Sequence, residues 1–280
     1  MNKRKTIYWL MMLPALIFLL VFMVVPIVFI IQQSLISEAG AFSFERYAQI
    51  LTSARDWKAI GLTIGVALLV TGFCELLAYP VAYLMARTKS RSWKTVFYII
   101  LVSPLLTSVV IRSFAWVVLL TQNGIINTIL IAAGVTEKPL TLLWNLKAVI
   151  LVYVQVLLPF AVMPLSSAFE EISTDYEKAS KSLGMGRVAT FFKITLPLTV
   201  TGAVSGGVMV FALTAGSYIT PLLIGGGRQD FLPVRIYQQA IQLMDLQGAG
   251  AYSCVLLILV LLIILPVEYA LKRWERKVYG

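Results

Sequence analysis

The sequence predicts an all-α, polytopic membrane protein that forms a single transmembrane domain over residues 1–280, and two observations support this fold class. Hydrophobic residues make up 59% of the chain and charged residues only 13%, whereas a soluble domain carries about 25% charge. The apolar residues also lie in runs of about twenty or more, the length at which a helix crosses a bilayer. We therefore expect six transmembrane helices.

Each apolar run defines one expected span. The first is uncharged, follows a basic leader, and is too long to be the apolar region of a signal peptide. The second and third each contain one charged residue, Glu75 and Arg112. The six spans are expected at about 9–31, 59–84, 96–120, 148–168, 199–224 and 251–271.

Lysine and arginine predict which side of the membrane each loop faces. Six spans place both termini on one side, and that side carries 15 basic residues against 7 in the opposite loops. Because basic residues are retained in cytoplasmic loops, we expect both termini and the loop after the fourth span to be cytoplasmic. The 15 are Lys3, Arg4, Lys5, Arg87, Lys89, Arg91, Lys94, Lys178, Lys181, Arg187, Lys193, Lys272, Arg273, Arg276 and Lys277; the 7 are Arg46, Arg55, Lys58, Lys138, Lys147, Arg228 and Arg235.

The composition argues against several kinds of site. The chain has no histidine and only two cysteines, both inside apolar runs, so we expect neither a disulfide framework nor a zinc site. It shows no constellation that could supply a nucleophile, a general base or a metal, so we expect no catalytic residue. The net charge of +10 follows from topology and does not indicate nucleic-acid binding. A G-x-G-x-x-A match at Gly184–Ala189 follows no strand, so we expect no nucleotide site.

Glu75 and Arg112 are ionisable residues inside spans, which are costly and usually mark a pathway or a buried pair. With about 1.5 Å rise per residue, the two side chains differ in depth by about 12 Å, which argues against a direct bond between them. Three interpretations stay open: a pair formed by a shift of the helices, a structural bond to another group, or contact with a substrate.

The longest charged interruption, Glu170 to Lys193, predicts a helix, a glycine turn and a second helix. Ile172, Tyr176, Ala179 and Leu183 recur at helical spacing and form one face. Ser173 or Thr174 is the expected N-cap, and Gly184-Met185-Gly186 ends the helix. A second amphipathic piece then runs from Arg187 and is expected to stop at Pro197.

This loop resembles the E-A-A-x-x-x-G-x(9)-I-x-L-P signature of the membrane subunits of binding-protein-dependent ABC importers. Gly184 is followed after nine residues by Ile194-Thr195-Leu196-Pro197. The match departs at one point: Lys178 and Ser180 stand where the family has its acid and its second alanine, and Glu177 comes one residue early. The resemblance extends to four further segments: Ala78–Tyr83, Ser103–Arg112, Leu158–Leu165 and Ser217–Gly227.

The resemblance implies a permease of the type I ABC importer fold, in a bacterial inner membrane, and is closest to the spermidine/putrescine (polyamine) branch. Its expected partners are a second, similar permease, two copies of a cytoplasmic ATP-binding subunit that hold ATP and magnesium, an extracytoplasmic binding protein and the bilayer. The chain itself would need no cofactor. The residues expected to couple it to the ATPase are Tyr176, Glu177, Lys178, Ala179, Ser180, Leu183, Gly184, Met185, Gly186 and Arg187.

The resemblance also implies that the helix entering Tyr218–Pro221 lines a translocation path and contributes to its outer gate. Pro221 frees backbone groups, which an apolar span tolerates only against protein or a wet cavity; an ordinary helix end before a glycine loop is the alternative. The residues expected along the path are Glu75, Tyr83, Arg112, Phe114, Trp116, Tyr218, Thr220 and Pro221. Alternatives are a permease for a phosphonate or opine, or an autonomous carrier or channel, for which the sequence lacks paired half-repeats.

Overall fold

The computed structural model describes residues 3–36 and 40–278, with side chains for 11–36 and 40–276. Every regular element within these ranges is a helix. Six helices are long and apolar enough to cross a membrane, which confirms the predicted fold class. They are Met11–Ser34, Ala54–Arg87, Val109–Ala132, Leu146–Glu171, Arg187–Gly216 and Leu246–Arg276.

The chain forms two compact units. The first comprises residues 1–58 and 235–258, and the second comprises residues 59–234 and 259–280. The long helices α4 (Ala54–Arg87) and α14 (Leu246–Val278) each contribute residues to both.

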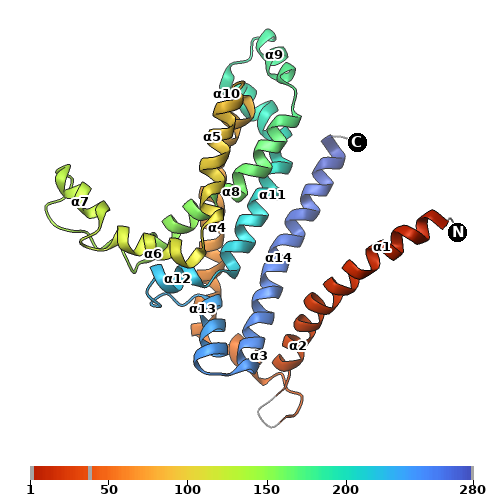
Figure 1. Ribbon diagram of the computed structural model, residues 1–280, viewed down its shortest axis with the longest axis vertical. Coiled ribbons are helices and arrows are strands. Elements are labelled where there is room, and N and C mark those ends of the chain that lie inside the picture. Colours follow the sequence, from red (N-terminus) through yellow and green to blue (C-terminus); the bar gives the residue numbers. More distant parts are fainter. Residues whose placement is uncertain (1–2, 37–39, 279–280) are drawn as a thin grey trace. The chain divides into compact units, whose positions relative to one another are not determined.

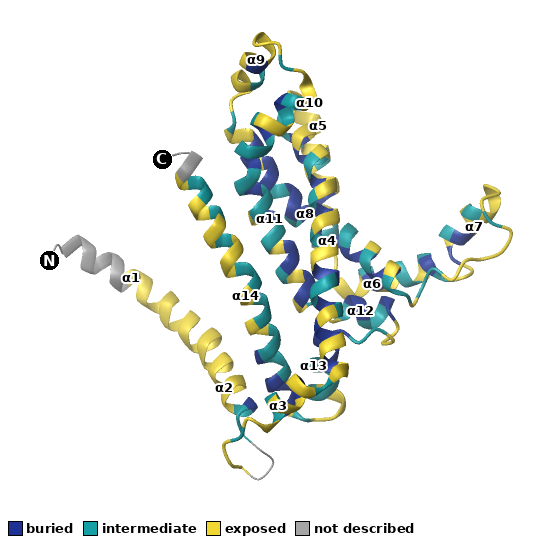
Figure 2. Ribbon diagram, turned by 180° about the vertical axis from the view of Figure 1, so that it is seen from behind, coloured by how far each residue is buried: buried dark blue, intermediate teal, exposed yellow. Residues whose placement is uncertain are grey.

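The first unit begins with a long apolar helix built from α1 (Lys3–Leu19), the π-helical turn η1 (Leu20–Val24) and α2 (Val25–Ser34). Nearly all its described side chains are exposed, from Met11 to Ile31, and this stretch is yellow in Figure 2. An apolar surface of this size needs lipid or another protein to cover it.

Polar contacts hold the other segments of the first unit together. They are α3 (Glu45–Thr52), the start of α4, the end of α13 (Leu232–Tyr237), the π-helical η4 (Gln238–Gln242) and the start of α14. Asp56 and Arg235 form a buried ion pair, and the Tyr252 hydroxyl donates to Asp56 Oδ1 at 2.9 Å. On a more exposed side, Arg46 Nη1 donates to Asp245 Oδ2 at 2.7 Å.

In the second unit, α8 (Leu146–Glu171) packs along α11 (Leu196–Gly216), and both are largely buried (Figure 2). Glycines permit the close approach: a Cβ at Gly202 would lie 2.6 Å from Ala168 Cβ, and one at Gly206 would lie 2.9 Å from Ala161 Cα. In Figure 1, α4 and α5 (Arg91–Val102) run beside this pair, with α9 and α10 at one end. Buried residues of α4 and α8, such as Val70 and Phe169, share one hydrophobic core.

Two of the expected spans contain breaks. The run 96–120 is divided into α5, the 3₁₀ turn η2 (Ser103–Leu106) and α6 (Val109–Leu120), which is followed by α7 (Ile125–Ala132). Pro104 lies at this break. It favours the break because it lacks the N–H that a continuing helix would need. The run 199–224 is divided into α11 and α12 (Ile219–Ile224).

Candidate functional site

The 170–197 loop contains a capped helix, α9 (Thr174–Ser182). The Ser173 Oγ accepts a hydrogen bond from the backbone N–H of Asp175 at 3.2 Å, which satisfies one otherwise unpaired donor of the first turn. Asp175 itself lies at the positive end of the helix dipole. The predicted N-cap is therefore confirmed.

Gly184 ends this helix in the left-handed conformation, with a φ of +81°. The N–H of Gly184 donates to the Lys181 carbonyl at 2.9 Å, and the N–H of Met185 donates to the Ser180 carbonyl at 3.1 Å. These are the two bonds of a Schellman turn, which favours glycine because a Cβ is strained there. The predicted glycine turn is confirmed. Gly186 is the N-cap residue of the next helix, α10 (Arg187–Thr190).

The predicted apolar face of α9 does not pack against the described part of the chain. Tyr176 is 57% exposed and Leu183 is 83% exposed. The buried residue is Ser180, whose hydroxyl lies 2.8 Å from that of Thr190 on α10. The helix therefore rests on its neighbours through a small polar contact and presents its apolar residues outward.

An ion pair anchors α9 to the end of α4. Arg87, the last residue of α4, donates from Nη2 to Glu177 Oε1 at 2.9 Å, and both side chains are more than four-fifths buried. Arg87 Nη1 also donates to the carbonyls of Phe169 and Ile172, at 3.3 and 3.1 Å. The Tyr83 hydroxyl donates to Glu177 Oε2 at 3.3 Å. One guanidinium thus joins α4, the end of α8 and α9.

Lys178 makes a different kind of contact. Its Nζ donates to Asp175 Oδ1 at 2.8 Å on the exposed side of α9, with both side chains more than two-thirds exposed. The hydrogen bond from Lys178, together with that from Ser173, lowers the pKa of the Asp175 carboxyl. The Lys178 ammonium group is therefore on the exposed side of the loop, whereas the Glu177 carboxylate is turned inward.

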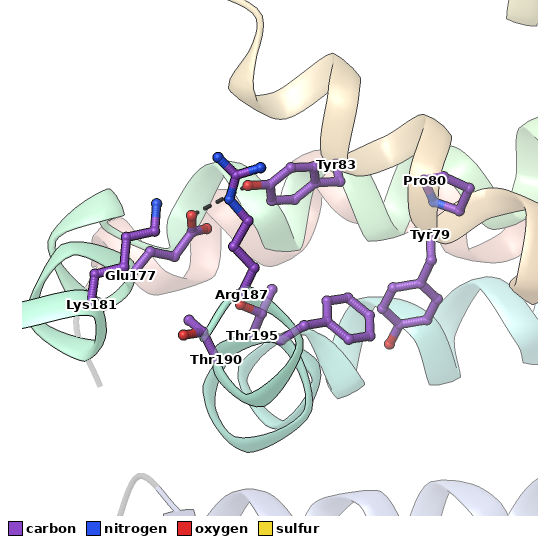
Figure 3. A pocket seen from close by; sticks show the side chains of 9 residues that line it. Tyr79, Pro80, Tyr83, Glu177, Lys181, Arg187, Thr190 and Thr195 are labelled. Carbon is purple, nitrogen blue, oxygen red and sulfur yellow. Dashed lines mark hydrogen bonds between the residues drawn. The ribbon is translucent and has the colours of Figure 1, made fainter. Parts of the chain in front are cut away.

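A cavity of about 620 Å³ lies between α4 and this loop (Figure 3). Besides the Glu177 anchor, the loop touches this part of α4 through the rings of Tyr79 and Phe191, whose centroids are 5.8 Å apart. Close packing is thus limited on this side of the loop. The cavity is lined by Tyr79, Pro80, Tyr83, Glu177, Lys181, Arg187, Thr190, Phe191 and Thr195.

The expectation that Pro197 ends the second amphipathic piece is wrong. The helix continues from Arg187 to Gly216 through the π-helical η3 (Phe191–Thr195). Pro197 is the second residue of α11. An α-helical residue at this position would donate to the carbonyl four residues earlier. The wider π turn directly upstream changes that pattern, so the missing N–H does not break the helix.

The structure separates the two charged residues predicted inside spans. Arg112 Nη1 donates to the Pro104 carbonyl at the break between α5 and α6. Glu75, on α4, has both carboxylate oxygens covered by protein atoms and no hydrogen-bond partner within the described chain. The two residues do not pair, so Arg112 makes a structural bond and Glu75 is left without a counter-charge.

The profile described as "Binding-protein-dependent transport system inner membrane component" matches residues 76–278. The chain belongs to this family. It is a permease subunit of an ABC importer, an inner membrane component with six candidate spans.

Individual proteins resemble this permease at modest identity. The spermidine/putrescine transport system permease protein PotB of Salmonella typhimurium is 28% identical over 266 residues, covering 93% of this chain and 92% of PotB. The molybdenum transport system permease protein ModB of Mycobacterium bovis is 30% identical over 236 residues, covering 83% and 86%. A crystal structure of a bacterial alginate ABC transporter, in complex with a periplasmic protein bound to an alginate pentasaccharide, matches with a TM-score of 0.76. It is 19% identical and covers 97% and 96% of the two chains.

The other residues expected along the permease's path lie in several settings. Glu75 and Tyr83 line different cavities. Trp116 Nε1 donates to Gln155 Oε1 at 3.1 Å, which joins α6 to α8. Phe114 and Tyr218 are exposed, and Thr220 is buried.

Pro221 lies at the third position of the short helix α12, after the break at Ser217 and Tyr218. A residue in the first turn has no intrahelical acceptor for its N–H, so the proline leaves no helical bond unmade there. The Ser217 carbonyl at the break accepts a hydrogen bond from the Tyr153 hydroxyl at 3.0 Å. Pro221 therefore lies in the first turn of the helix that follows the break in the expected span 199–224.

Sequence reasoning missed three features of the permease. Arg87 was counted only as a topological charge, although it lies just after a predicted span, on the side where the sequence also places Glu177. Glu268 lies within the span formed by α14 and was overlooked among the intramembrane charges. The Asp56–Arg235 pair joins positions far apart in sequence, so no local sequence pattern predicts it.

Among the described residues, no group of three or more His, Cys, Asp or Glu side chains could hold a metal.

Proposed function

We propose that this permease forms the membrane path of an importer for polyamines of the spermidine/putrescine type. The similarity to PotB over 93% of the chain supports this substrate class. The permease supplies no catalysis: ATP and magnesium are bound by a separate ATPase, as expected for a chain with no evident nucleotide site.

The observation that carries the coupling role is the way α9 is held. Its inner side is tied to α4 through Arg87 and Glu177 at 2.9 Å. Its outer side exposes Tyr176 and Leu183, two apolar residues on one helical face. Such a face fits a groove in a partner protein. We infer that α9 docks on the ATPase and that the anchor transmits its displacement to α4.

The orientation follows from charge. The side with 15 basic residues is cytoplasmic, so both termini and α9 face the ATPase. The complex contains a second permease, two ATPase copies and an extracytoplasmic binding protein. The exposed apolar surface of Met11 to Ile31 suits a bilayer or the second permease.

The proposed path residues are Glu75, Arg112, Phe114, Trp116, Tyr218, Thr220 and Pro221, and Tyr83 is assigned to the anchor, since its hydroxyl donates to Glu177. The proposed coupling residues are Tyr176, Glu177, Lys178, Ala179, Ser180, Leu183, Gly184, Met185, Gly186 and Arg187.

The test is purification of the tagged permease from its native host in a mild detergent, followed by reconstitution of the recovered complex. We expect a co-purifying ATPase whose hydrolysis is stimulated by the binding protein loaded with putrescine, together with ATP-dependent uptake of labelled putrescine. Uptake by the permease alone would instead indicate an autonomous carrier. Stimulation by a phosphonate, an opine or an oxyanion, without any response to polyamines, would reject the substrate class.

A further inference from the structure

Glu75 is partly buried on α4, and its carboxylate has no hydrogen-bond partner among the described residues. Both carboxylate oxygens are covered by protein atoms. An ionised carboxylate in an apolar interior is stable only when it is paired. Arg112, the basic residue considered as its partner from the sequence, is bonded to the Pro104 carbonyl instead.

The neighbouring helix leaves room for this carboxylate. Glu75 Oε1 lies 3.2 Å from the position that a Cβ would take at Gly206, and 3.6 Å from the corresponding position at Gly207. The Glu75 carboxylate therefore occupies space beside α11 that is open because Gly206 and Gly207 have no side chains. Larger residues at these positions would displace it.

A cavity of about 330 Å³ lies beside Glu75 and is bounded by α4, α11 and α14. Both carboxylate oxygens are covered in this structure, so a ligand in the cavity reaches them only when the walls shift. Its size is within the range of small-molecule sites. Glu75 is the one carboxylate in its lining, and the rings of Tyr79 and Phe211 and several aliphatic side chains form the walls. The lining residues are Leu68, Thr71, Glu75, Tyr79, Ala203, Val204, Gly207, Val208, Phe211, Ile263, Ile264 and Val267.

The chemistry of this cavity selects its ligand class. A carboxylate attracts an ammonium group, aromatic faces stabilise a cation further, and aliphatic walls accept a methylene chain. An alkylammonium combines all three features, whereas an oxyanion would meet a like charge. We propose that Glu75 and this cavity bind one ammonium group of a polyamine during its passage through the membrane. The inference rests on the proposed polyamine substrate class.

The first experiment measures putrescine uptake by the complete importer carrying Glu75→Gln, which keeps the side-chain shape and removes the charge. We expect the maximal rate to fall at least about tenfold, the size expected for losing a hydrogen bond to a charged group. The half-saturating concentration should stay unchanged, because the binding protein captures the substrate. Glu75→Asp, which retains the charge, should recover part of the rate.

Glu268→Gln is the matched control, because this acid lies on α14 without lining the cavity; it should leave uptake unchanged. If Glu75→Gln transports putrescine normally, the inference is wrong while the proposed substrate class stands. If the wild-type importer takes up no polyamine, the substrate class itself fails. If Glu75→Gln reduces recovery of the second permease but not the rate per assembled complex, the acid pairs with that subunit, which also overturns the inference.

A second measurement does not depend on the stability of a variant. Dicyclohexylcarbodiimide reacts with carboxyl groups in apolar surroundings, and the site of labelling on the wild-type importer can be read by mass spectrometry. We expect putrescine to protect Glu75 from labelling and uncharged 1,4-butanediol to leave it unprotected. Equal labelling with and without putrescine would overturn the proposal.

Discussion

Arg87 and Glu177 form the hydrogen-bonded ion pair, 2.9 Å long, that joins the last residue of α4 to α9. The same guanidinium donates to the carbonyls of Phe169 and Ile172 at the end of α8. A displacement of α9 therefore acts on two long helices through one side chain. The bond is largely buried, whereas Tyr176 and Leu183 on the face proposed to meet the ATPase are exposed.

Arg87→Ala should detach α9 from α4 without preventing membrane insertion. Removing one partner of a largely buried ion pair costs about 3 kcal/mol, so the loop should become sensitive to proteolysis. ATP hydrolysis by the complex should continue, while the uptake per ATP falls. The control is Lys94→Ala, which breaks an exposed pair with Glu170 at 2.5 Å and should cost less than about 1 kcal/mol. Equal behaviour of the two variants would contradict the anchor.

Gly184→Pro should abolish coupling while leaving the membrane-inserted fold intact. A proline ring cannot adopt the φ of +81° found at this position, so the Schellman turn cannot form. Gly184→Ala should cost about 1–2 kcal/mol from backbone strain alone, because a Cβ there meets no atom within 4 Å. Gly65→Ala on α4 is the control, since a Cβ there also meets no atom within 4 Å and its φ is not positive. The measurements are binding-protein-stimulated ATP hydrolysis and uptake, and normal uptake by Gly184→Pro would rule out a docking role for the turn.

Asp56→Asn should destabilise the first unit by about 3 kcal/mol, because it removes the negative charge that faces the buried Arg235 guanidinium. The Arg235 guanidinium also lies over the ring of Tyr252, at 6.0 Å, which compensates only in part. Asp245→Asn is the matched control: its pair with Arg46 is about one-quarter exposed, so the loss should be smaller. Thermal unfolding of the detergent-solubilised permease measures both. A smaller shift for Asp56→Asn than for Asp245→Asn would contradict the burial argument.

Gly202→Ala should destabilise the packing of α8 on α11. The new methyl group would lie 2.6 Å from Ala168 Cβ and 2.8 Å from the Pro164 carbonyl oxygen, and such overpacking costs about 1–3 kcal/mol. Gly72→Ala, in the open on α4, should be neutral or stabilising by a few tenths to about 1 kcal/mol, because alanine favours the helix. The unfolding temperatures of the two variants should therefore shift in opposite directions or by clearly different amounts. Similar shifts would show that the helices relax around the added methyl group.

Local patterns were sufficient for parts of the loop. The Ser173 N-cap and the Gly184 turn follow from which residues satisfy helix ends, and both are present. The extent of helix after Pro197 was not predictable in this way. In a sequence, a proline predicts the end of a helix. Here the helix continues through Pro197 because the π turn over Phe191–Thr195 lies directly before it.

The difference in depth of about 12 Å between Glu75 and Arg112, from helical rise, disfavoured a pair between them, and the structure contains none. It could not identify the Pro104 carbonyl as the partner of Arg112, because that contact depends on the break between α5 and α6. Nor could it show that glycines on α11 make room for Glu75.

The sequence by itself determined the class of this protein, because six apolar runs must cross a bilayer, and their basic flanks predict an orientation. It also determined the turn of the 170–197 loop, because glycine and cap residues act over a few positions. The tertiary structure decided which charges meet. Glu177 turns inward to Arg87 while Lys178 points outward, and Glu75 has no hydrogen-bond partner within the described part of the chain. These outcomes depend on how helices distant in sequence pack, and helical spacing along one segment carries no information about its neighbours.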